Sequence, residues 1–217
     1  MTPSLIIVDH FDSFSFNLVE AFERTGCSVE VLRSSAPAAL IIERAINATA
    51  SIILSPGPGR PSDAGSFGET IRLARGRIPL LGICLGHQAL IEAAGGTVGP
   101  AVEIVHGKSS LVEHDGRGLF QGVPSPMRIG RYHSLCARGV PGRFTVHARL
   151  DGMVMAISDE ASLQFGLQFH PESILTPLGD RLLGNFLDYA AGGRRDGQRG
   201  QSGPPLPSCG NGPAMRL

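Results

Sequence analysis

The sequence predicts an α/β fold in which an open mixed sheet is flanked by helices. The first half of the chain alternates short β-branched runs with helical stretches, which is typical of parallel strands and covering helices. Residues 102–169 contain shorter strand-like segments separated by turn residues, which favours antiparallel or mixed strands. With 217 residues, 42% of them hydrophobic, the chain has the material for one large core rather than several domains.

Each element of the first half is predicted from an apolar pattern bounded by turn residues. Runs of Leu, Ile and Val predict the strands. Gly26 closes the first helix and Gly95-Gly96 closes the fourth. A loop rich in Pro and Gly, residues 56–65, follows the third strand. The expected strands are residues 4–9, 28–33, 51–55 and 79–83, and the expected helices are residues 13–24, 38–47, 66–76 and 85–94.

A final amphipathic helix is expected at residues 178–191, where apolar residues recur at helical spacing. Thr176 is its expected N-cap, with Pro177 at the first helical position. Residues 1–191 therefore form one domain. Eleven of the twenty-six residues 192–217 are Gly or Pro, which predicts a disordered tail because few large apolar side chains are present to offset the entropy of ordering.

The charge balance and the apolar pattern exclude several classes of partner. Nineteen Lys and Arg match nineteen Asp and Glu, which argues against a nucleic-acid partner because such proteins need a positive surface. The only apolar run near the N-terminus, residues 5–8, is too short for a signal peptide or a membrane span, so we expect no membrane contact and a cytoplasmic location. Four scattered cysteines without a C-x-x-C pair predict neither a metal site nor a disulfide framework.

Cys84 lies between a predicted strand and a predicted helix. Gly82 and Gly86, two residues on either side, permit the sharp turn of a nucleophile elbow, which exposes the thiol. The N-terminus of the following helix favours a thiolate and a developing oxyanion. A buried structural cysteine at a strand end is the alternative interpretation of this motif taken alone.

A histidine and a carboxylate follow another apolar strand, in the sequence QFHPES at residues 168–173. His170 could accept the thiol proton and deliver it to a leaving group, while Glu172 could orient the ring and stabilise the imidazolium. Taken alone, such a pair also fits a surface hydrogen bond.

The loop SPGPG at residues 55–59 follows a predicted parallel strand, where open α/β sheets bind ligands. Gly57 and Gly59 can supply backbone donors, whereas Pro58 has no N–H. One of these donors and the Leu85 N–H would form an oxyanion hole, in which the loss of one donor costs about 3 kcal/mol. An ordinary Pro/Gly turn is the alternative.

Four motifs in this order resemble the class I, or triad-type, glutamine amidotransferases: SPGPG, GICLGHQ at residues 82–88, RYHSL at residues 131–135 and QFHPES. More narrowly, they resemble the glutaminase subunits of anthranilate synthase and aminodeoxychorismate synthase. The resemblance extends from about residue 5 to residue 190 and implies a flavodoxin-like sheet. Two departures are His10, where the family commonly has Asn, and Pro177, where it commonly has an acidic residue.

The resemblance implies that Cys84 attacks the side-chain amide of L-glutamine, that His170 protonates the departing ammonia, and that water cleaves the glutamyl thioester. By matching position, it assigns glutamine and oxyanion binding to seven residues: Gly57, Pro58, Gly59, Leu85, Gln88, Ser134 and Leu135. Of these, Gln88 lies one helical turn after Cys84 on the same face, and His87 is expected to be structural.

The resemblance also implies a partner, because released ammonia needs a second active site that this chain lacks. That partner would be a chorismate-converting synthase, making anthranilate for tryptophan or 4-amino-4-deoxychorismate for folate. Residues 106–109 would lie near it. No cofactor is expected in this chain, and magnesium would belong to the synthase. Two alternatives stay open: the glutaminase component of another ammonia-consuming ligase, and a catalytically silent subunit that senses glutamine.

Overall fold

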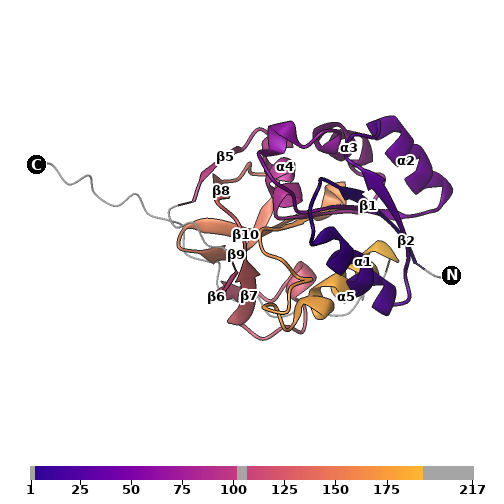
Figure 1. Ribbon diagram of the computed structural model, residues 1–217. Helices are drawn as coiled ribbons and strands as arrows, with labels where there is room; N and C mark the ends of the chain where they lie inside the picture. Colours follow the sequence, from indigo (N-terminus) through magenta and orange to yellow (C-terminus); the bar gives the residue numbers. More distant parts are fainter. Residues whose placement is uncertain (1–2, 102–106, 193–217) are drawn as a thin grey trace, which may run out of the picture.

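The computed structural model describes residues 3–101 and 107–192, and these form a large sheet with helices on both faces (Figure 1). The predicted tail, residues 192–217, lies outside the described residues except for Gly192, and so does His106 of the segment expected near the partner. The boundary predicted at residue 191 therefore stays a prediction.

The described strands form one nine-stranded sheet and one two-stranded sheet. The order of the large sheet is β2-β1-β3-β4-β11-β10-β9-β6-β7. Its strands from β2 to β11 are parallel, and those from β11 to β7 pair antiparallel. The strands are β1 (Ser4–Asp9), β2 (Ser28–Arg33), β3 (Ser51–Leu54), β4 (Leu80–Ile83), β5 (Thr97–Pro100), β6 (Lys108–His114), β7 (Met127–Arg131), β8 (Leu135–Gly139), β9 (Thr145–Leu150), β10 (Met153–Asp159) and β11 (Gln164–Leu167).

Two hydrophobic clusters cover the two faces of the sheet. Alternate residues of β1 enter different clusters: Leu5 and Ile7 pack with α1 and α5, and Ile6 and Val8 pack with α2, α3 and α4. Figure 1 shows the same division of helices above and below the strands. The helices are α1 (Ser15–Arg24), α2 (Ala38–Asn47), α3 (Phe67–Ala74), α4 (Leu85–Ala93) and α5 (Gly179–Ala190). The predicted mixed sheet flanked by helices is confirmed.

The start predicted for the last helix was wrong in detail. The helix α5 begins at Gly179 with Leu178 as its N-cap, and no side chain caps it. The Thr176 hydroxyl instead donates to the His170 carbonyl at 2.6 Å and accepts from the Gly130 amide at 2.9 Å. The Thr176 side chain therefore makes hydrogen bonds to other segments of the chain instead of capping α5, as the local sequence had predicted.

The strands β5 and β8 form a short antiparallel pair. β5 follows α4 and was not predicted, whereas β8 lies within residues 102–169, where antiparallel or mixed strands were expected. Pro100 of β5 pairs with Leu135 of β8, and the Ala101 amide donates to the Ser134 carbonyl at 2.9 Å. This pair fixes residues 134 and 135 beside α4, since β5 and β8 both contact that helix.

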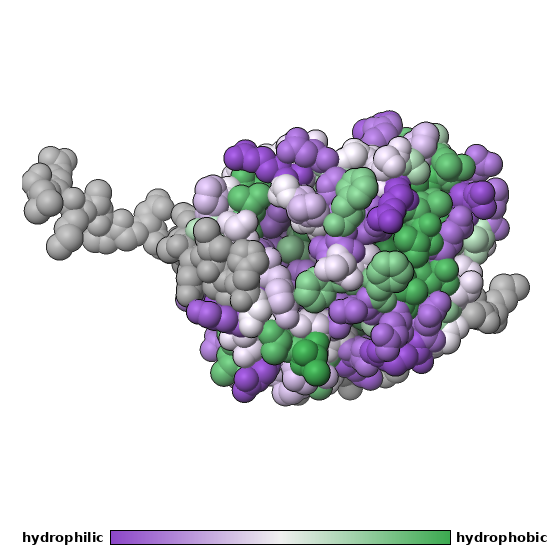
Figure 2. Space-filling view, in the orientation of Figure 1, coloured by the Kyte–Doolittle hydropathy of each residue, from purple (hydrophilic) through white to green (hydrophobic). Residues whose placement is uncertain are grey.

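The surface mixes hydrophilic and hydrophobic residues over the face shown in Figure 2, with hydrophobic residues gathered toward the side of the N-terminus. Among the described residues, no helix is both long and apolar enough to cross a membrane.

Candidate active site

Cys84 lies on a strained turn between β4 and α4. It is the N-cap of α4, with φ 51° and ψ −97°, a conformation that costs a non-glycine residue about 1–3 kcal/mol. A Cβ on Gly82 would lie 2.4 Å from the Gly86 carbonyl, and one on Gly86 would lie 2.5 Å from the Leu54 carbonyl. Both glycines are therefore required by close backbone contact, and the turn has the geometry of a nucleophile elbow.

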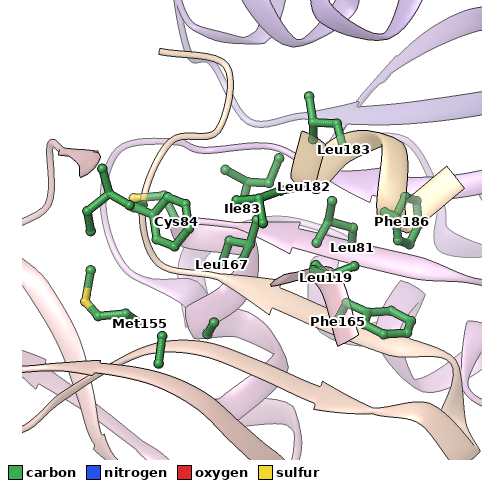
Figure 3. Packing of buried hydrophobic residues seen from close by; sticks show 14 of the residues in the cluster. Leu81, Ile83, Cys84, Leu119, Met155, Phe165, Leu167, Leu182, Leu183 and Phe186 are labelled. Atoms are coloured by element: carbon green, nitrogen blue, oxygen red, sulfur yellow. The ribbon is translucent and has the colours of Figure 1, made fainter. Parts of the chain in front are cut away.

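The hydrophobic core packs against this turn. Cys84 is 7% exposed and belongs to the cluster on the α1 and α5 face of the sheet. Figure 3 shows it at one end of that cluster, beside Ile83 and Leu167. The thiol is thus held by packed apolar groups rather than by a mobile loop.

Parallel pairing of β4 with β11 brings the histidine segment to the same edge of the sheet. Ile83 pairs with Leu167, and the Cys84 amide donates to the Leu167 carbonyl at 2.8 Å. The chain therefore leaves β11 directly beside the elbow. Thr176 then anchors the His170 carbonyl, as described above, and the His170 amide donates to the Gly130 carbonyl at 3.3 Å.

His170 and Glu172 form a buried pair next to the thiol. His170 Nδ1 lies 2.7 Å from Glu172 Oε1, and the side chains are 2% and 0% exposed. Burial alone would lower the pKa of His170, but hydrogen bonds and charge interactions with Cys84 and Glu172 raise it well above its usual value. Both neighbours therefore favour the charged form of the ring.

The second ring nitrogen of His170 is available for chemistry. Nε2 is buried and has no hydrogen bond of normal geometry to the described residues, although Cys84 interacts closely enough to raise the pKa of the ring. Phe14 and Tyr132 pack edge-on against the ring, with centroids 5.2 and 5.0 Å away. These contacts hold the imidazole in one orientation toward the sulfur.

A cavity of about 150 Å³ opens beside Cys84 and gathers all seven residues predicted to bind glutamine and its oxyanion. Tyr132 and His133 also line it, and sequence reasoning had not assigned them to the site, although RYHSL contains both. The lining residues are Gly57, Pro58, Gly59, Cys84, Leu85, Gln88, Tyr132, His133, Ser134 and Leu135.

The 55–59 loop is pressed against the wall of this cavity. A Cβ on Gly57 would lie 2.7 Å from the His10 carbonyl and 2.8 Å from Leu85 Cδ2. The Ser55 hydroxyl accepts from the His10 amide at 2.9 Å and donates to the Pro56 carbonyl at 2.6 Å. The loop can therefore present its backbone to a ligand in one fixed position.

Polar groups of Gln88 and Leu135 meet at the far side of the cavity. Gln88 Nε2 donates to the Leu135 carbonyl at 2.9 Å and to Gln168 Oε1 at 3.1 Å. His133 Nδ1 also lies 3.0 Å from the Leu135 carbonyl. Both bonds of Gln88 use its nitrogen, so neither of them occupies its side-chain oxygen.

The neighbouring His87 is completely buried. Burial lowers its pKa to about 3, and the nearby backbone of Gly166 in β11 and Val154 in β10 opposes this shift only in part. A neutral imidazole at this position joins α4 to the sheet beneath it. No group of three or more metal-binding side chains occurs among the described residues.

Comparison with known proteins identifies the family of the chain. Residues 6–190 match the family model described as glutamine amidotransferase class-I. The chain belongs to this family. Two relatives cover most of its length: anthranilate synthase component 2 of Vibrio parahaemolyticus, 49% identical over 86% of this chain and 96% of that protein, and the pyocyanine-specific anthranilate synthase component 2 of Pseudomonas aeruginosa, 50% identical over 84% and 92%.

Solved structures share the fold at lower identity. A Thermoplasma acidophilum protein described as a putative GMP synthase component matches with a TM-score of 0.79 and 21% identity, over 90% of this chain and 97% of that one. A glutamine amidotransferase from Thermotoga maritima matches with a TM-score of 0.68 and 17% identity, over 88% and 98%. The predicted class I amidotransferase fold is confirmed.

Proposed function

We propose that this chain is the glutamine-hydrolysing subunit of an anthranilate synthase and works in the cytoplasm with a chorismate-converting component I. The observation that carries the chemistry is the buried His170–Glu172 pair beside a cysteine on a strained elbow. The two relatives named anthranilate synthase component 2, each about half identical to this chain, support the choice of pathway.

The reaction begins when the Cys84 sulfur attacks the side-chain carbonyl carbon of glutamine. A carbon–sulfur bond forms and the carbonyl electron pair moves onto oxygen. The Leu85 N–H and one donor of the 55–59 loop stabilise this oxyanion, because both line the same cavity. Gln88, Ser134 and Leu135 hold the amino-acid end of the substrate.

His170 then transfers a proton from Nε2 to the departing nitrogen, and ammonia leaves as the tetrahedral intermediate collapses to a thioester. Glu172 keeps the ring oriented and stabilises its charged form. Neutral His170 next removes a proton from water, which attacks the thioester, and glutamate departs as the thiol is restored. The ammonia passes to component I.

Replacing the nucleophile tests the chemistry. Cys84→Ser is expected to lower glutamine hydrolysis on the order of 10⁴-fold or more, because the hydroxyl lacks a reactive anion at neutral pH. Cys27→Ser is the control, since Cys27 is a buried cysteine whose thiol contacts Thr25 rather than the cavity. Equal glutaminase activity in wild-type and Cys84→Ser protein would refute the assignment.

The partner is tested by product analysis. The chain, purified with component I from its host, should convert chorismate and glutamine to anthranilate, while ammonia should replace glutamine in the Cys84→Ser complex. Formation of 4-amino-4-deoxychorismate instead would move the chain to folate supply. Release of glutamate with chorismate untouched would indicate a different ammonia-consuming ligase.

A further inference from the structure

Gln168 is a completely buried amide at the edge of the active site. It follows the last residue of β11, one position beyond the register pair of Leu167 with Ile83. Its own backbone amide donates to the Met155 carbonyl of β10 at 2.9 Å. Gln168 therefore lies beside Cys84 where two adjacent parallel strands end, with its main chain bonded to β10.

Both ends of the Gln168 side chain are engaged. Its Nε2 lies 3.7 Å from the Cys84 sulfur, and its Oε1 accepts from Gln88 Nε2 at 3.1 Å. The side chain thus connects the attacking atom to a residue that lines the glutamine cavity.

The direction of these hydrogen bonds follows from the Leu135 carbonyl, which can only accept. Because Gln88 donates to this carbonyl at 2.9 Å, the nitrogen of its amide faces Leu135 and Gln168. Gln168 must then present its oxygen to Gln88, which turns its NH₂ group toward the sulfur. The chain of contacts therefore ends with an N–H donor at Cys84.

We propose that Gln168 is a further catalytic residue: its amide N–H stabilises the Cys84 thiolate, and its oxygen holds Gln88 in its substrate-binding orientation. This role rests on the proposed glutamine hydrolysis. A hydrogen bond to a charged group is stronger than one to a neutral group, and burial strengthens it further. Gln168 thus favours the reactive form of the thiol without adding a charge.

The titratable groups around the thiol are His170, with Glu172 behind it, and His133 and Tyr132 on the cavity wall. All of them are present in a Gln168 variant. A change in thiol titration in Gln168→Met, which adds no charge, therefore reports the loss of the amide.

Alkylation of Cys84 by iodoacetamide as a function of pH, followed by mass spectrometry, tests the role independently of turnover. In the full-length chain, Gln168→Met keeps the length of the side chain but removes the donor, and should raise the midpoint of alkylation by about one pH unit. Gln168→Glu should raise it further, because an acceptor and a negative charge then face the sulfur. With component I present, kcat/KM for glutamine should fall about tenfold or more in both variants.

Gln164→Met is the matched control. Gln164 is equally buried and begins the same strand, but its amide donates to Ile71 and accepts from Arg143. Its loss should lower the thermal unfolding midpoint and leave the alkylation midpoint unchanged. The two Gln168 variants give independent tests of the donor, so a folding failure in one leaves the other decisive.

The outcomes separate two failures. If wild-type Cys84 alkylates like an ordinary thiol and the complex hydrolyses no glutamine, the proposed function itself falls. If the wild type is active and either folded Gln168 variant keeps the wild-type alkylation midpoint, only the role of Gln168 is overturned. The role of Gln168 is established if the alkylation midpoint of Cys84 rises in the Gln168 variants and stays unchanged in Gln164→Met.

Discussion

At the scale of single residues, the charge on His170 gives the site a pH dependence whose sign is fixed. The interaction with Cys84 and Glu172 raises the pKa of His170 above that of an unfolded chain. The protonated ring therefore stabilises the folded state fully below about pH 6.5, and this contribution is lost as the pH rises through the raised folded pKa.

Glu172→Gln tests the predicted loss of folding stability with rising pH, because it removes the charge that helps raise the pKa of His170. The thermal unfolding midpoint of the wild type should fall as the pH rises above about 6.5, and the variant should show a smaller fall that is complete at lower pH. Glutamine hydrolysis should drop on the order of 10³-fold, since the ring loses its charged partner. Glu69→Gln, which removes an exposed carboxylate, is the control. Identical pH profiles in wild type and Glu172→Gln would contradict this account.

Sequence reasoning predicted the residues whose role depends on backbone shape or local order. Gly82 and Gly86 were predicted because a sharp turn has a compositional signature, and the structure gives a steric reason for each. The hydrogen bonds of Thr176 to Gly130 and of Gln168 to Cys84 and Gln88 could not be predicted, because they join segments far apart in the chain. Gln168 and Cys84 are 84 positions apart, and only the sheet register shows that they meet.

At the scale of elements, the first residue of α5 packs against the segment that carries His170. A Cβ at Gly179 would lie 1.7 Å from the Pro171 carbonyl oxygen and 2.6 Å from its carbon. The start of the helix is thus in direct backbone contact with the residue between His170 and Glu172.

Two glycine substitutions within α5 should have opposite effects. Gly179→Ala must push Pro171 aside, so we expect a loss of about 1–3 kcal/mol in unfolding free energy and reduced glutamine hydrolysis. Gly184→Ala meets no atom within 4 Å and should stabilise the helix by about 0.5–1 kcal/mol with unchanged activity. Chemical denaturation and glutaminase assays measure both. Equal stability of the two variants would show that α5 can shift freely.

A second histidine connects the antiparallel half of the sheet. His147 of β9 lies 2.9 Å from Asp115 Oδ2 through Nδ1 and 2.7 Å from the Ser158 hydroxyl of β10 through Nε2. Ser158 is 3% exposed, so a substrate cannot reach it, and this arrangement acts as a structural connection between strands.

Asp115→Asn should change how stability responds to acid. Burial would raise the pKa of Asp115, but hydrogen bonds from His147 and the Arg117 amide outweigh it and lower the pKa. The carboxylate therefore stabilises the fold above about pH 4, and this contribution is lost as the pH falls through the lowered folded value. The difference in unfolding midpoint between wild type and variant should shrink below pH 4. Asp188→Asn, at an exposed carboxylate on α5, should show no such trend.

Most elements were predictable because their apolar periodicity is local. The first half matched the expected order of strands and helices, with helix ends shifted by one or two residues. The strand β5 was not predictable, since a four-residue strand with partly exposed faces carries little periodic signal.

At the scale of the whole molecule, the order of strands was the part that the sequence could not supply. The pattern of residues indicated parallel strands followed by antiparallel ones, but not that β11 lies between β4 and β10. Strand order depends on which faces and edges complement one another across the complete chain, whereas periodicity reports only the local environment of each strand.

The composition of residues 192–217 predicts that they contribute little to the domain. Deleting them should leave the unfolding midpoint within about 1 °C, because a removal that disturbs no core costs well under 0.5 kcal/mol. Glutamine hydrolysis should be unchanged. Differential scanning fluorimetry and a binding assay with component I measure the effect. A clear loss of binding or stability would show that the segment has a docking role.

The position of β11 between β4 and β10 has a consequence during synthesis of the protein. During synthesis the turn that carries Cys84 leaves the ribosome first. Gln168 and His170, the neighbours of its sulfur, follow only when residues 164–172 emerge near the end of the domain. Until β11 is inserted, β4 and β10 lack the strand that lies between them. Cys84 then has neither His170 nor Gln168 beside it. On the proposed mechanism, a growing chain therefore cannot hydrolyse glutamine, and the site becomes competent only when the domain is complete.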